Sequence, residues 1–560
     1  MNRVSCALRR AALAACVLMI GACGPSGDEQ TETAPSADAS GRITLRVMSF
    51  NIEWGGTHVR FDSIAEAIRE ARADIVGIQE AEGNLERLAD DLGWYHSRRN
   101  YVISRFPLVD PAAGRGHFLF AEVAPGEVVA VASVHLPSSP SGTGWLRSGW
   151  SPSDVAAMER EVRLPAIEPV LEVLQSLHTA GMPVFLAGDF NAPSHVDWTK
   201  AAIGKLPHRD IAFDWPVSRA VAEAGFRDSF RTVHPDPVRD PGFTWWAGRP
   251  QIEDYNPSDP TWRSRIDYVW YAGPVEVTDS LVVGEADAEG VDVAVTPWPS
   301  DHRAVLAMFE VDPAPMPELI TTGRRVYEAG EVIEFTYHSS TTAQPTILLE
   351  RATEPGQVTP RIRLTAPARS GTVRLPDAEL SAGHYEVSLL DSAGFTASSN
   401  EFWILEPDEL ATLEIGGDRF IVGEPLAFEW SGAPGNRHDW IGIFPAPNEP
   451  NPNAPNEDPN EDIHQSSLAN AANGDANGDI HQASHQASIE LNEPNEEPNE
   501  DTHQYLTYGY VDARSSGRMV LGPETVEAKW PLPPGRYVAR LLLDDGYEVL
   551  SETRPFAIIE

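Results

Sequence analysis

The stretch PVFLAGDFNAPS, residues 183–194, combines the pattern of a buried strand with polar groups at its end. Val184 to Ala187 are apolar and bounded by strand-breaking residues, which predicts an interior strand. Asp189 and Asn191 follow, and Pro193 comes two residues after Asn191. These residue types form ordinary turns, but the carboxyl end of a strand is also where open α/β sheets bind ligands. The stretch therefore predicts either a turn or part of a site, and the remaining strand ends decide between them.

Five further segments each finish an apolar run with a metal-binding or acid–base group. In chain order they supply Asn51 and Glu53 in MSFNIEW, Glu80 in IVGIQE, His135 in ASVHLPSS, Asp267 in SRIDYVW, and Asp301 and His302 in PSDHRAV. One such ending would be unremarkable as a turn, because polar residues are common at strand ends. Together with GDFN there are six, and we expect them to meet at one edge of a sheet and form a site.

Strand and helix patterns alternate from Ile43 to about Val311. The strand patterns are ITLRVMSF, DIVGIQ, HFLFAEV, VVAVASVHL, PVFLAG, RIDYVWYAG and AVLAMFEV. Helical spacing of apolar residues covers Asp62–Arg72 and Asp154–Leu177, with Ser153 or Asp154 as the cap of the second helix. The sequence therefore predicts one mixed α/β domain over residues 43–312, a size that is within the range of α/β enzymes.

The motifs N-x-E, QE, GDFN and SDH, in this order, resemble those of the endonuclease/exonuclease/phosphatase superfamily of divalent-metal phosphoesterases. That superfamily includes pancreatic-type deoxyribonucleases, abasic-site endonucleases, bacterial sphingomyelinases and inositol-polyphosphate 5-phosphatases. The resemblance spans Arg46 to about Phe309, roughly half of the chain. It implies a four-layer α/β sandwich with two central sheets and a site at their shared edge.

The resemblance also implies a role for each polar group. The implied metal ligands are carboxylates and an amide: Glu80 as the main ligand, with Asn51, Asp301 and Glu53. The implied catalytic groups are His302 as general base, Asp267 holding its imidazole, Asp189 aligning the attacking water, Asn191 donating to a phosphate oxygen, and His135 stabilising the charge on phosphorus. Hydrolysis of a phosphodiester needs such charge neutralisation and positioning. Hard oxygen ligands favour Mg²⁺, with Mn²⁺ or Ca²⁺ as alternatives, and the sequence leaves open whether one or two ions are used.

The first 42 residues have the pattern of an export signal followed by a tether. Three arginines precede the apolar run Ala11–Ile20, and small residues then lead to Cys23, a pattern that resembles a bacterial lipobox. We expect a lipoprotein signal peptide at 1–22, lipidation of Cys23 and a flexible tether at 23–42. The predicted location is the bacterial cell envelope, at the outer membrane. Since the other two cysteines would leave with the signal peptide, we expect no structural disulfide.

After PAPMP (residues 313–317) helical patterns give way to short alternating strands, which predict two immunoglobulin-like β-sandwich modules at 318–406 and 412–560. The modules resemble each other. VYEAGEVIEFTY (326–337) matches RFIVGEPLAFEW (419–430), and LSAGHYEVSLLDSAGF (380–395) matches LPPGRYVARLLLDDGY (532–547). An insert at about 445–504, dense in Asn, Pro, Glu and Asp, interrupts the second module, and its composition predicts disorder.

The formal net charge of −41 restricts the partners, because an acidic surface repels polyanions and argues against tight nucleic-acid binding. The predicted function is an exported, membrane-anchored, divalent-metal-dependent phosphoesterase. Its substrate would be the phosphodiester bonds of extracellular nucleic acid, phospholipid head groups or small diesters. The alternative is a non-catalytic binding or adhesion lipoprotein, with the α/β domain as scaffold and the β-sandwich modules binding a protein or glycan. The sequence leaves both alternatives, and the substrate, open.

Overall fold

The computed structural model describes residues 41–114, 116–206, 209–248, 263–340, 343–351, 361–375, 380–406, 411–436, 439–446, 506–511, 514–522, 530–543 and 549–560. The predicted signal peptide, the lipidation site Cys23, most of the tether and residues 447–504 of the insert lie outside these ranges. Within them, no helix combines the length and the apolar character that a membrane crossing requires.

Two mixed β-sheets form the centre of the α/β domain. The first contains β1 (Ile43–Asn51), β2 (Ile75–Gln79), β3 (Tyr95–Ser97), β4 (Val102–Ser104), β11 (Val275–Glu285), β12 (Val293–Val295) and β13 (Ala304–Val311), in the order β12-β11-β13-β1-β2-β4-β3. The second contains β5 (Leu108–Val109), β6 (Leu119–Ala124), β7 (Glu127–His135), β8 (Val184–Asp189), β9 (Arg227–Asp228), β10 (Asp267–Ala272) and β14 (Ala314–Pro315). Its order is β5-β6-β7-β8-β10-β9, with β14 paired to β7.

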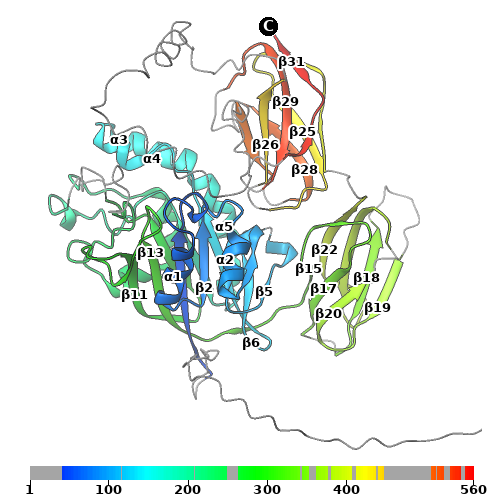
Figure 1. Cartoon of the computed structure of the whole chain (residues 1–560), viewed down its shortest axis with the longest axis horizontal. Coiled ribbons are helices and arrows are strands. Elements are labelled where there is room, and N and C mark those ends of the chain that lie inside the picture. The colour runs from blue at the N-terminus through cyan, green and yellow to red at the C-terminus, as the bar shows by residue number, and fades with distance from the viewer. Residues whose placement is uncertain are drawn as a thin grey trace, which may run out of the picture. The chain divides into compact units, whose positions relative to one another are not determined.

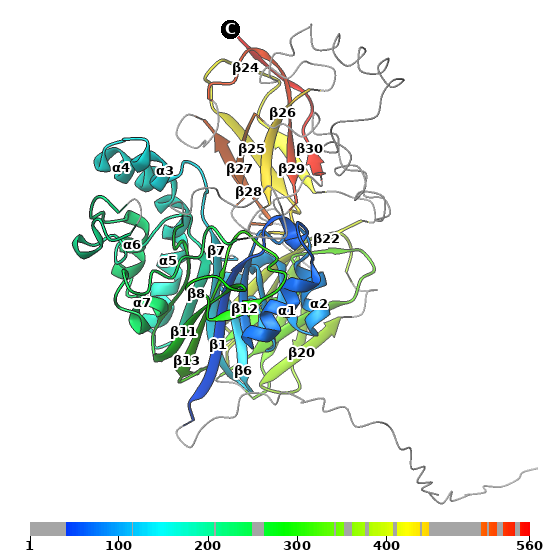
Figure 2. The same ribbon diagram turned by 60° about the vertical axis from the view of Figure 1, so that its left-hand side comes forward.

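Helices cover the outer face of each sheet. The helices of the domain are α1 (Asp62–Ala71), α2 (Leu85–Leu92), α3 (Gly142–Arg147), α4 (Pro152–Val162), α5 (Leu164–Thr179), α6 (Pro216–Glu223) and α7 (Ser229–Val233). The apolar residues of α1 and α2 pack on the first sheet next to β2 (Figure 1), and those of α5 and α6 pack on the second. Figure 2 shows α5 and α6 on one side of β7, β8 and β1, with α1 and α2 on the other. The predicted four-layer α/β sandwich is confirmed.

Strand β1 is apolar almost throughout because both of its faces are buried. Leu45 and Val47 point into the core between the two sheets, whereas Met48 and Phe50 point into the core beneath α1 and α2. Side chains alternate between the two faces of a strand, so a strand that is covered on both faces needs apolar residues at nearly every position. The sheets approach closely at Gly77, where a Cβ atom would lie 2.9 Å from the Cβ of Ala187.

The helix predicted over residues 154–177 is two helices, α4 and α5. Pro165 stands in the first turn of α5, where a proline is tolerated, but its missing amide hydrogen interrupts the hydrogen bonding between α4 and α5. A second proline, Pro169, lies inside α5 without ending it. The cap of α4 is Ser151, whose side chain accepts a hydrogen bond from the Asp154 amide. The predicted caps Ser153 and Asp154 were therefore wrong, because both already lie inside α4.

The chain after the α/β domain is all β-structure. The first region has β15 (Leu319–Thr322), β16 (Val326–Glu328), β17 (Ile333–His338), β18 (Thr346–Arg351), β19 (Arg361–Thr365), β20 (Ser370–Leu375), β21 (Gly383–Leu390) and β22 (Thr396–Leu405). The second has β23 (Thr412–Ile415), β24 (Arg419–Ile421), β25 (Leu426–Ser431), β26 (Trp440–Pro445), β27 (Thr507–Tyr510), β28 (Ser516–Leu521), β29 (Gly535–Leu542), β30 (Val549–Glu552) and β31 (Phe556–Ile559).

These two regions have the same topology. The sheets β15-β17-β20 and β16-β22-β21-β18-β19 correspond to β23-β25-β28 and β24-β31-β29-β26-β27, with β30 added beside β29, and each pair of sheets encloses one apolar core. In both regions a tyrosine hydroxyl donates to a carbonyl four residues earlier: Tyr385 to Ser381 and Tyr537 to Pro533, each at 2.7 Å. The repeat in the sequence thus corresponds to a repeated β-sandwich, while the predicted boundaries of the domains stay predictions.

Candidate active site

The first sheet brings Asn51, Glu80 and His302 to one edge. Strands β1 and β2 are parallel, with Asn51 opposite Gln79, so Glu80 leaves β2 beside the end of β1. Strand β13 runs antiparallel to β1, and His302 lies two residues before β13 begins. The Ser300 hydroxyl joins these segments, because it donates to the Asn51 carbonyl (2.7 Å) and accepts from the His302 amide (3.0 Å).

The second sheet contributes His135, Asp189 and Asp267 in the same way. Strands β7 and β8 are parallel, and His135 stands opposite Asp189. Strand β10 runs antiparallel to β8, and Asp267 pairs with Asp189 from the other side. Thr244 fixes the start of β10, because its hydroxyl accepts hydrogen bonds from the Ile266 and Asp267 amides.

Side-chain contacts cross from one sheet to the other. The Asn51 Nδ2 donates to Glu80 Oε1 (2.8 Å) and to Asp189 Oδ2 (3.1 Å). The His135 Nε2 lies 3.8 Å from Glu80 Oε1 and 3.6 Å from Asp189 Oδ2. Carboxylates of both sheets therefore share one small region, and an amide and an imidazole link them.

His302 lies among three carboxylates. Its Nδ1 is 3.0 Å from Asp267 Oδ2, and its Nε2 is 3.7 Å from Asp189 Oδ2 and 3.8 Å from Asp301 Oδ1. Burial disfavours the charged imidazole, but the negative charges of Asp267, then Asp189 and Asp301, outweigh burial and raise the pKa of His302 well above its usual value. The protonated form of the imidazole is therefore favoured when no cation is bound.

The two acids that contact Asn51 differ in their ionisation. Burial and the neighbouring charge of Asp267 raise the pKa of Asp189 to about 6. For Glu80, burial acts in the same direction, but the charge of His135 and the hydrogen bond from Asn51 outweigh it and lower the pKa. Glu80 is thus held as an ion, and a fixed carboxylate suits a cation ligand.

Several backbone positions at the site adopt the left-handed conformation that non-glycine residues rarely take. Glu53, Trp54, Glu80 and Asn191 have φ values of 53°, 47°, 55° and 48°. Such positions cost roughly 1–3 kcal/mol each and cluster at functional sites. Local contacts involve three of them: Glu80 Oε2 accepts from the Trp54 amide (3.2 Å), and the Asn191 amide donates to Asp189 Oδ1 (2.8 Å).

The other predicted site residues also lie in this network, but their contacts differ from a simple ligand set. Glu53 Oε2 accepts from the Asp301 amide (3.1 Å), so Glu53 positions the loop that carries Asp301. The Asn51 amide oxygen accepts from the Glu53 amide (3.0 Å), and an amide oxygen has a second lone pair that can ligate a cation. Asn191 Nδ2 donates to the Leu136 carbonyl (3.0 Å). The structure brings all nine predicted residues together, and their individual roles stay predictions.

Sequence reasoning gave no role to two side chains that contact the site. Trp54 directly follows the N-x-E motif and is 61% exposed beside Glu80. Trp245 donates from its Nε1 to Asp301 Oδ2 (3.2 Å), and it pairs with His302 in an isolated β-bridge. The consecutive tryptophans Trp245 and Trp246 are visible in the sequence, but no pattern indicates that Trp245 would lie next to His302.

The donor set fits a hard divalent cation. Glu80 and Asp301 have partly exposed carboxylates, with 24% and 16% of their side chains accessible. Asp189, Asp267 and His302 form a second possible set, whose ligand atoms lie within 4.8 Å of one another. The His302 Nδ1 in that set is already bonded to Asp267. Carboxylate oxygens are the ligands that Mg²⁺, Mn²⁺ and Ca²⁺ prefer, so we regard Glu80 and Asp301 as the better cation ligands.

Two stacked sheets with carboxylates and imidazoles at their common edge define a phosphoesterase- or nuclease-like α/β fold. Residues 48–302 match the model of the Endonuclease/Exonuclease/phosphatase family. This match covers most of the α/β domain and agrees with the resemblance of the motifs.

Individual relatives were also found. The uncharacterized protein F14F9.5 of Caenorhabditis elegans is 28% identical over 294 residues, which cover 47% of this chain and 91% of that protein. Among solved structures, an endonuclease/exonuclease/phosphatase from Beutenbergia cavernae is 17% identical with a TM-score of 0.31, covering 64% of this chain and 99% of that one. A humanized D. rerio TDP2 is 14% identical with a TM-score of 0.29, covering 48% and 98%.

Proposed function

We propose that the α/β domain is a divalent-metal-dependent phosphoesterase that hydrolyses phosphodiester bonds. The observation that carries the proposal is the arrangement around Asp189. The Asp189 Oδ2 contacts Asn51 at 3.1 Å, His135 at 3.6 Å and His302 at 3.7 Å. One acid thus stands between two imidazoles and next to Asn51, which also contacts Glu80. A phosphate bound there would meet positive charge and a proton acceptor together.

The side chains divide the chemistry among them. His302 exchanges a proton at Nε2, because its Nδ1 is held by the buried Asp267 carboxylate. Asp189 orients the attacking water, and His302 accepts the proton of that water at Nε2. His135 places a second imidazole against the phosphate. When bound by Glu80 and Asp301, a divalent cation would polarise a phosphate oxygen and stabilise the leaving group.

The substrate in this proposal is a phosphodiester outside the cytoplasm: extracellular nucleic acid, a phospholipid head group or a small diester. The net charge of −41 favours a substrate bound by a few local contacts over an extended electrostatic interface with nucleic acid. The export pattern before Cys23 supports a lipid-anchored protein of the cell envelope. A Cys23→Ser variant should be found in the soluble fraction of the producing cells, and retention in the membrane fraction would contradict the anchor.

Hydrolysis of bis(p-nitrophenyl) phosphate tests the proposed activity. The purified protein should release p-nitrophenol with Mg²⁺ or Mn²⁺, and EDTA or the substitution His302→Ala should abolish the release. Asp214→Asn is the matched control, because the exposed Asp214 pairs with Arg219 on the outer side of α6. Full activity of H302A would refute the assigned roles. A folded wild-type protein without activity on any diester and with any divalent ion would favour the binding or adhesion function.

A further inference from the structure

A cavity of about 420 Å³ lies in the α/β domain between the helices α3 and α4 and the chain segments around residues 198–211 and 263–264. None of the residues to which we assign catalysis lines it. Its walls combine three arginines with tryptophan and aliphatic side chains: Arg147, Arg209, Arg263, Trp150, Trp198 and Ile211. We call this cavity the arginine pocket. In a chain with a net charge of −41, three arginines around one cavity are a local exception.

Arg209 is the least exposed of the three arginines. It is 5% exposed, and its guanidinium carbon lies 4.1 Å from the centre of the Trp198 ring. Burial lowers the pKa of Arg209 to about 10, which still leaves it charged at neutral pH. Within the described part of the chain, neither the Arg209 Nε nor the Trp198 indole N–H has a hydrogen-bond acceptor.

Buried donors without acceptors are unusual, because leaving such a group unpaired costs about 1–3 kcal/mol, and more when it is charged. Here both donors belong to side chains that line the same cavity. The two nitrogen atoms are themselves buried, so the acceptor oxygens of a ligand would reach them once the Arg209 and Trp198 side chains turn toward the cavity. The cavity therefore suits an anionic group with several oxygens.

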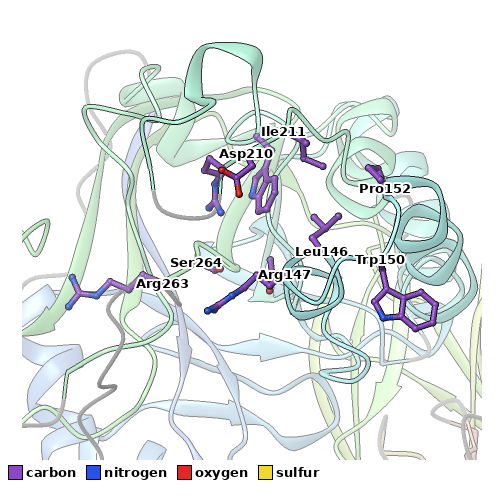
Figure 3. A pocket seen from close by; sticks show the side chains of 11 residues that line it. Leu146, Arg147, Trp150, Pro152, Asp210, Ile211, Arg263 and Ser264 are labelled. Atoms are coloured by element: carbon purple, nitrogen blue, oxygen red, sulfur yellow. The ribbon is translucent and has the colours of Figure 1, made fainter.

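Figure 3 shows how the labelled side chains are distributed around the cavity. The Arg147 side chain extends toward Ser264, Asp210 and Ile211 form one wall, and the Arg263 guanidinium points outward at the rim. Asp210 is exposed and is the single acid among the lining residues that the structure describes, against three arginines. Leu146 and Pro152 add apolar surface, which fits an anionic group attached to a carbon skeleton.

Two backbone pairings connect the wall of the arginine pocket to the candidate active site. Ser264, in its wall, pairs with Trp245 in a β-bridge, and Trp245 pairs with His302 in another. Neighbouring strands lie about 4.8 Å apart, so Ser264 and His302 are separated by about 10 Å of backbone. A small molecule of about this length could place one phosphate group at the active site and another in the pocket.

We propose that the arginine pocket binds a second, non-scissile phosphate of the substrate, so that the preferred substrate is a phosphodiester bearing a further phosphate group. This rests on the proposed phosphoesterase function. Phosphate offers acceptor oxygens to Arg209 and Trp198, and an arginine guanidinium pairs well with phosphate oxygens. Nucleotides and phosphorylated polyols share this chemistry.

Binding of inorganic phosphate in EDTA tests the pocket without any turnover. Isothermal titration of the full chain should show phosphate binding in the wild type, and Arg209→Gln should weaken it about 10- to 100-fold, as expected for loss of a charged hydrogen bond. Arg147→Gln serves as a second variant in case R209Q does not fold. Arg219→Gln is the matched control, since Arg219 is exposed and pairs with Asp214. Equal binding by the wild type, R209Q and R147Q, or no binding by the wild type, would overturn the proposal.

A kinetic comparison tests the substrate class. Thymidine 5′-(p-nitrophenyl phosphate) and its 3′-phosphorylated form differ by one phosphate. The wild type should have the higher kcat/KM for the second compound, through a lower KM, and R209Q should lose that preference. Thymidine 3′,5′-bisphosphate and inositol 1,4-bisphosphate are then compared as inhibitors. The stronger inhibitor shows whether the substrate is a nucleotide or a phosphorylated polyol. Turnover of both thymidine compounds with equal kcat/KM would overturn the second phosphate site but not the phosphoesterase function. Arg209-dependent phosphate binding without turnover of any diester would overturn the phosphoesterase function but not the phosphate site.

Discussion

The substitution Asp267→Asn tests the role of the buried acid behind His302. Asp267 is fully buried, and its two oxygens lie 3.0 and 3.2 Å from His302 Nδ1. Asparagine keeps the shape of the side chain and leaves the backbone contact with Thr244 unchanged, but it removes the negative charge. A hydrogen bond to a charged group contributes about 1.5–3 kcal/mol, and we expect kcat to fall by about 10- to 150-fold.

The assay is hydrolysis of bis(p-nitrophenyl) phosphate at saturating Mg²⁺, with thermal unfolding as a check that D267N is folded. Loss of the carboxylate should also lower the pKa of His302, which ¹⁵N NMR of the imidazole can follow in EDTA, because Asp267 is the largest of the charges that raise it. The reasoning is refuted if folded D267N retains the wild-type kcat, or if the His302 titration is unchanged by the substitution.

Two further predictions concern stability. Asp197→Asn should lower the free energy of unfolding by about 3–5 kcal/mol, because buried Asp197 pairs with both Arg231 and Arg265, and the substitution leaves Asp228 as the carboxylate partner of Arg265. The control is D214N, which removes an exposed ion pair with Arg219 and should change stability by less than about 1 kcal/mol in urea unfolding. Folding raises the pKa of His302, so in EDTA its contribution to the free energy of unfolding is complete below the unfolded pKa of about 6.5 and is lost as the pH rises through the folded pKa. Urea unfolding between pH 6 and 9 should show this loss of stability in the wild type. If the same loss persists in His302→Gln, other groups cause it.

The central strands were predictable because the two-sided core dictates their sequences. Strands such as β1 and β8 are buried on both faces, and their apolar runs end where polar groups begin. The order of the motifs then indicated which strand ends meet. The helix break at Pro165 was less visible, since the apolar spacing continues across it and favours one long helix.

The contacts within the site depend on tertiary geometry that a linear pattern does not contain. The sequence indicated that Asn51, Glu53 and Asp301 lie near a cation, but not that Asn51 would donate to two acids or that Glu53 would bond to the Asp301 amide. The arginine pocket was equally hidden. Arg147, Arg209 and Arg263 come from three distant segments with no shared motif, and only folding places them around one cavity.

The most direct test of the account is diester hydrolysis as a function of Mn²⁺ concentration, in the wild type and in Glu80→Gln. Glu80 keeps an ionised, partly exposed carboxylate beside Asn51. The wild type should be inactive in EDTA and should saturate with Mn²⁺, and E80Q should need at least about tenfold more Mn²⁺ for half its maximal rate. Hydrolysis that persists in EDTA, or identical Mn²⁺ curves for the two proteins, would contradict a divalent-metal centre at this edge of the sheets.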